Sequence, residues 1–114
     1  MCGYRLADDR PEAFASVVAR QLESRHYGER WARRWLDVAR FAEDQAHTFK
    51  ARRYPHGHRY RDWVVRSLNA DMPYDQFVRL QLAGDLLTDT NVQTTDEART
   101  AIDRIAATGF VVAG

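Results

Sequence analysis

Apolar side chains recur every third or fourth residue along most of this 114-residue chain, the spacing of amphipathic helices. No segment shows the sustained apolar–polar alternation that is typical of a half-buried strand. The sequence therefore predicts an all-α fold, a compact bundle of about five helices. They are expected over about residues 12–24, 28–42, 58–69, 74–87 and 96–108. One long irregular connection is expected at about 45–58, where Pro55 and Gly57 interrupt the pattern.

The first predicted helix carries a single apolar stripe, since Phe14, Val17, Val18 and Leu22 recur at helical spacing. In the second, the tryptophans are expected on one face and the arginines on the opposite one. The predicted structural core consists of Trp31, Trp35, Tyr60, Trp63, Tyr74 and Phe77. The predicted contacts to a partner or an anion are Arg30, Arg33, Arg34, Arg40 and Arg59.

Composition and length fit one soluble globular domain, predicted over residues 8–114, with 45% hydrophobic and 29% charged residues. The apolar end at 110–114 suggests a piece of a longer protein, and we expect this domain to be truncated at both ends. The net charge of +1 hides a basic middle, because residues 25–66 carry eleven Arg or Lys against five Asp or Glu. A charge this close to zero argues against a dedicated nucleic-acid binder.

Cys2 is the only cysteine, so this sequence offers neither an intramolecular disulfide nor the Cys-x-x-Cys-His attachment of a c-type haem. Asp8 and Asp9 stand where a signal peptide would need an apolar run. No apolar run approaches the roughly 20 residues of a membrane-spanning helix. The sequence itself thus predicts no transmembrane segment and no haem in this chain.

Five sequence blocks, in this order and spacing, resemble one known family. They are YGERWARRWLDVARFAE (27–43), YRDWV (60–64), NADMPYDQFV (69–78), QLAGDL (81–86) and ATGF (107–110). Together they resemble the planctomycete cytochrome-associated domain of unknown function 1549, and the resemblance covers about residues 13–112. This family has no established activity or catalytic residues, so the resemblance carries over no site residue.

The resemblance implies a setting for the chain. Members of the family are typically large, exported, multi-domain proteins, often with a separate cytochrome segment that holds the haem. An extracytoplasmic or periplasmic location is therefore the family expectation, while this chain has no signal peptide of its own. The leading interpretation is a helical interaction or scaffold module within such a protein. Its partner would be the adjoining domain, another protein or an anionic glycan, because arginine pairs well with carboxylate and sulfate.

A second hypothesis is a metal-dependent hydrolase or another polysaccharide-active domain. His56 and His58 alternate in a loop, and His47 and Asp44 precede them, so that imidazole and carboxylate ligands could meet around one ion. This hypothesis requires the four side chains to converge, whereas an interaction module lets them scatter. For a general acid–base pair, no spacing singles out two of the carboxylates.

Overall fold

The computed structural model describes residues 10–41, 44–45, 52–53, 56–88 and 91–113. Its elements are α1 (Ala13–Leu22), α2 (His26–Val38), β1 (Asp44–Gln45), β2 (Arg52–Arg53), α3 (Gly57–Asn69), α4 (Tyr74–Ala83), α5 (Thr95–Ala107) and α6 (Gly109–Ala113). The predicted all-α fold is confirmed: five longer helices form at the predicted places, and α6 adds one short turn after α5. The segment 45–58, predicted as irregular, contains Gln45 and the strand β2, so it is not wholly irregular: β1 and β2 pair antiparallel, with Gln45 opposite Arg52.

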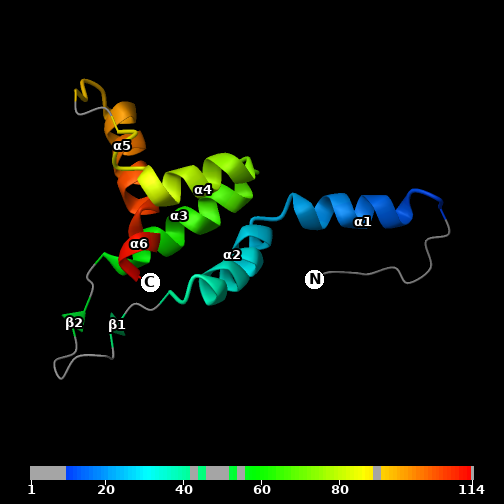
Figure 1. Cartoon of the computed structure of the whole chain (residues 1–114). Helices are drawn as coiled ribbons and strands as arrows, with labels where there is room; N and C mark the ends of the chain where they lie inside the picture. Colours follow the sequence, from blue (N-terminus) through cyan, green and yellow to red (C-terminus); the bar gives the residue numbers. More distant parts are fainter. Residues whose placement is uncertain (1–9, 42–43, 46–51, 54–55, 89–90, 114) are drawn as a thin grey trace.

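The helix α3 lies at the centre of the bundle (Figure 1), where α2, α5 and α6 all pack against it. The helix α4 runs beside α3 and also contacts α5 and α6. By contrast, α1 projects away from the other helices, and none of its residues is buried. The bundle therefore consists of α2 to α6, with α1 as an arm.

The face of α2 that packs on α3 is built from small residues. Gly28 and Ala32 are buried, and the Gly28 amide donates a hydrogen bond of 2.8 Å to the Asn69 side chain at the end of α3. A Cβ atom at Gly28 would lie 2.5 Å from that side chain, so only glycine permits this approach. The predicted tryptophan face was therefore wrong for Trp31, which is 46% exposed, because the small residues turn α2 away from it.

Aromatic rings from α2, α3 and α4 form the centre of the core. The Trp63 and Phe77 rings stack with centroids 5.2 Å apart, and the Trp35 ring meets Phe77 edge-on at 5.0 Å. Tyr60, Trp63 and Phe77 are buried and Trp35 is half-buried against them, as predicted. Tyr74 is 70% exposed, so its predicted place in the core was wrong: α4 begins at this residue, one turn before its first buried side chain.

A buried amide joins the three helices at this core. Gln81 is 2% exposed, and its Oε1 accepts hydrogen bonds from the Tyr60 hydroxyl at 2.6 Å and from the Trp35 indole N–H at 3.1 Å. The same indole N–H lies 3.1 Å from the Tyr60 oxygen, and Gln81 Nε2 donates to the Phe77 carbonyl. Because buried polar groups without partners are costly, this network fixes how α2, α3 and α4 align.

The end of the chain closes the other side of Tyr60. Ala107 is completely buried, and a Cβ atom at Gly109 would lie 2.7 Å from the Cβ of Tyr60. Phe110 packs against the same core. The sequence block ATGF therefore acts as a close-packed closure of α5 and α6 on α3.

Candidate interaction surfaces

The most unusual surface is the apolar stripe of α1, formed by Phe14, Val17, Val18 and Leu22. These side chains are 79%, 37%, 40% and 57% exposed. They lie at helical spacing on one side of α1, as the sequence predicts. The predicted apolar stripe is therefore open to solvent in this chain.

The predicted arginine contacts lie mainly on α2. Arg30, Arg33 and Arg34 are all exposed there, and the Arg34 guanidinium lies 5.2 Å from the centre of the Trp31 ring. This distance suits a cation–π contact between the two exposed side chains. The arginines and this tryptophan thus share the solvent side of α2.

The other two predicted arginine contacts lie apart from this group. Arg59 is exposed in the first turn of α3. Arg40 follows α2 with φ of 52°, a left-handed conformation, and the Phe41 amide after it donates to the Leu36 carbonyl. That bond closes the end of α2, so Arg40 terminates the helix as well as carrying charge.

A groove of about 760 Å³ runs between α2 and α3. Leu36, Phe41 and Val65 supply its half-buried apolar lining, and Arg33 and Glu29 stand at its edge. The hydrogen bond with His26 lowers the pKa of Glu29, so this carboxylate is charged at neutral pH. The groove therefore offers an apolar floor between charges of both signs.

The predicted metal ligands are only partly within the described residues. His56 precedes α3 and His58 lies in its first turn, and both are exposed. Asp44 is in β1, while its side chain and the whole of His47 lie outside what the structure describes. Among the described residues, no three His, Cys, Asp or Glu side chains are grouped so that they could hold a metal ion. The convergence of the four predicted ligands stays a prediction.

The polar side chains whose partners lie far away in the sequence were not predicted. Gln81 binds residues 21 and 46 positions away, and Arg66 pairs with Asp103 at 2.6 Å across α3 and α5. The only local signal for Gln81 was a polar residue between two leucines, Leu80 and Leu82, in α4. Among the helices described, none is both long and apolar enough to cross a membrane.

The chain matches the model of a known protein family. The family model described as "Protein of unknown function (DUF1549)" matches residues 4–114. No curated protein and no solved structure shows significant similarity to this chain.

Proposed function

This chain belongs to the DUF1549 family of proteins of unknown function, and from that premise we propose that it is a helical interaction module of a larger, exported, cytochrome-associated multi-domain protein. The observation that carries the proposal is the exposed apolar stripe of α1. The partner that we assign to it is an adjoining domain of the same parent protein.

The short length of α1 favours its packing against a partner. A helix of 10 residues is marginal in water on its own, and helices of this length in proteins depend on packing of their apolar face. Phe14 and Leu22 leave most of their surface exposed, and neither packs against the core of this chain. Covering the stripe would remove the exposed apolar surface, which supports α1 as a docking element.

The charges near α1 indicate what kind of surface would cover it. Only residues 23–25 separate α1 from α2, so a partner that covers the stripe also comes near the arginines of α2. Arg30 and Arg34 are exposed on that helix. A partner with an apolar groove and a rim of Asp or Glu would therefore satisfy both surfaces.

The test is binding between this chain and the rest of its parent protein, added as a separate polypeptide and followed by calorimetry. The double variant Phe14→Ser/Val18→Ser should weaken binding about 100-fold, because each side chain contributes roughly 1.5 kcal/mol of apolar burial. Leu82→Ser is the matched control, because this α4 side chain is 60% exposed and lies outside α1. Equal affinity of the double variant and the unchanged chain would refute the proposal.

A sulfated glycan is the competing occupant of the arginine side. Retention on a sulfated matrix that disappears in Arg30→Ala/Arg34→Ala but persists in the α1 variant would indicate glycan binding through α2. Loss of domain binding in the α1 variant, with little retention on that matrix, would support the adjoining domain.

A further inference from the structure

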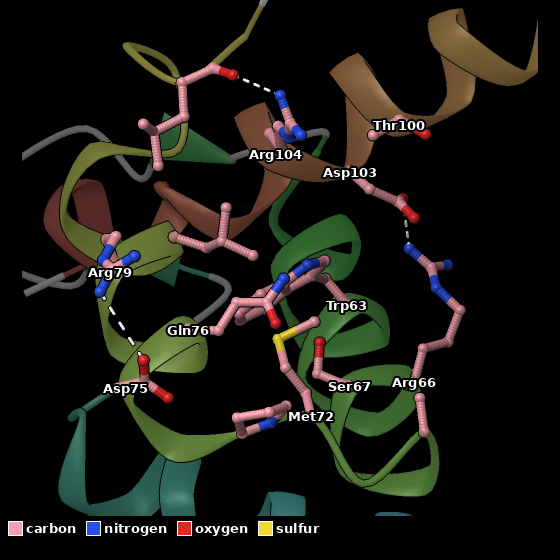
Figure 2. Close-up of a pocket in the computed structure, with 14 residues that line it drawn as sticks. Trp63, Arg66, Ser67, Met72, Asp75, Gln76, Arg79, Thr100, Asp103 and Arg104 are labelled. Atoms are coloured by element: carbon pink, nitrogen blue, oxygen red, sulfur yellow. Dashed lines mark hydrogen bonds and ion pairs between the residues drawn. The ribbon is translucent and has the colours of Figure 1, made fainter.

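A second cavity lies on the other side of α3, between α3, α4 and α5 (Figure 2), and has a volume of about 700 Å³. This size is within the range of small-molecule sites. It is separate from α1 and from the arginines of α2, so it is independent of the function proposed above. All of the residues that line it are among those the structure describes.

The floor of this cavity is apolar and is formed by buried side chains. Trp63 and Leu80 are 3% and 9% exposed, and Met72 lines the cavity beside them. Ser67, which is 4% exposed, adds a hydroxyl to this floor. Such a floor suits a flat or compact apolar group and provides one polar contact.

Charged side chains from all three helices surround the opening. Arg66 pairs with Asp103 at 2.6 Å, and Arg79 pairs with Asp75 at 3.6 Å. Arg104 donates a hydrogen bond to the Leu87 carbonyl (Figure 2). The rim therefore holds three guanidinium groups against two carboxylates, a net positive charge.

The arginines keep binding capacity in this arrangement. A guanidinium has five N–H donors, so an arginine that is paired with one carboxylate still has the donor capacity for a second oxygen ligand. Both pairs are about half exposed or more, and exposed ion pairs are weak, so reorienting Arg79 toward a ligand costs little. Planar guanidinium groups suit the oxygens of carboxylate and phosphate.

We propose that the pocket between α3, α4 and α5 binds a small organic anion, whose phosphate or carboxylate meets the arginine rim while its apolar part lies over Trp63 and Met72. Gln76, which extends over the cavity in Figure 2, supplies an additional amide to the ligand. Neither the arginine rim nor the apolar floor is sufficient for binding on its own, so the ligand must carry both a negative charge and an apolar group.

The experiment is an NMR titration of the isotope-labelled chain at low salt. Phenyl phosphate and benzoate distinguish a phosphate from a carboxylate ligand. Inorganic phosphate carries only the anionic group, and benzyl alcohol carries only the aromatic group. At least one of the two aromatic anions should shift the amides of Ser67, Gln76 and Thr100. Each half-ligand should bind at least about tenfold more weakly, because it lacks one set of contacts.

Variants of the rim test the direction of the charge effect. Arg79→Ala should weaken binding about tenfold, and Asp75→Asn should strengthen it about threefold, because it removes a competing negative charge. Arg30→Ala on α2 is the control for net charge and should leave the affinity unchanged. Circular dichroism would verify that each variant is folded.

Three outcomes would overturn the proposal. The first is the absence of shifts at the pocket amides with either aromatic anion. The second is equal binding of inorganic phosphate and phenyl phosphate. The third is an equal loss of affinity in Arg30→Ala and Arg79→Ala, which would indicate attraction to the overall charge.

Discussion

Replacement of Gln81 by leucine tests whether the buried amide network aligns the helices. The glutamine side chain accepts hydrogen bonds from Tyr60 at 2.6 Å and Trp35 at 3.1 Å, and a leucine in its place would accept neither. The indole of Trp35 keeps the Tyr60 oxygen as an acceptor, but the buried Tyr60 hydroxyl loses its own. An unsatisfied buried donor costs about 1–3 kcal/mol, so we expect a loss of about 2 kcal/mol in the free energy of unfolding.

The coupling free energy between Gln81 and Tyr60 is more informative than the stability lost in the single variant Gln81→Leu. Tyr60→Phe should cost about 1 kcal/mol, because it removes the bond to Gln81 and one of the two acceptors of the Trp35 indole, while Gln81 and Trp35 stay bonded to each other. In the double variant the orphaned hydroxyl is gone, but the half-buried Trp35 indole N–H has lost both of its acceptors and replaces it as the one unsatisfied donor. The total loss should therefore stay near about 2 kcal/mol instead of the sum of about 3 kcal/mol. A coupling of about 1 kcal/mol is therefore expected.

Urea denaturation followed by tryptophan fluorescence measures these differences. Tyr74→Phe is the matched control: this tyrosine is exposed, so its change should be within about 0.5 kcal/mol. Additive losses for Tyr60→Phe and Gln81→Leu, or a loss for Gln81→Leu no larger than the control, would refute the idea that this network holds the core.

Two titratable side chains, one glycine and the predicted metal ligands give four further predictions. Burial raises the pKa of Tyr60, so its contribution to the free energy of unfolding is complete below pH about 10 and is lost as the pH rises through the folded pKa. When unfolding is measured from pH 8 to 12, this part of the pH dependence should be absent in Tyr60→Phe. Hydrogen bonds from the backbone before α5 lower the pKa of Glu97, so its contribution to stability is present above pH about 4.5 and is lost as the pH falls through the folded pKa. Thermal melts from pH 3 to 7 should show this pH dependence in the unchanged chain and not in Glu97→Gln. Gly28→Ala should destabilise the chain by about 1–3 kcal/mol in urea, because the new Cβ atom overlaps the end of α3. If the hydrolase hypothesis holds, mass spectrometry should find stoichiometric metal that is lost in His56→Ala/His58→Ala, whereas equal metal content in the two proteins would contradict it.

The helices were predictable because their signal is local. A repeat of apolar residues and the breaks at Pro55 and Pro73 depend only on neighbouring residues, and the predicted boundaries lie within a few residues of those observed. The face that α2 presents was not predictable in the same way. Hydrophobicity favours Trp31 as the buried residue, but the approach of α2 to α3 depends on Gly28 and on a side chain 41 positions later.

The polar residues of the core and of the proposed pocket could not be predicted from the sequence for a related reason. Gln81 and Ser67 look like ordinary polar residues on helices, and their burial results from helices that meet only after folding. The same applies to Arg66, whose partner Asp103 lies on α5. Periodicity identifies the faces of each helix, but the pairing of polar groups between helices requires their relative positions.

The arm α1 has a correctly predicted apolar face that no described part of this chain buries. Periodicity predicts that Phe14 and Leu22 share a stripe, and the usual inference is that such a stripe faces the core. In this chain the core is already complete without α1, since α2 to α6 cover Trp63 and Phe77. The apolar face of α1 is therefore not needed to close the bundle, so its four side chains are available to stabilise contact with another surface.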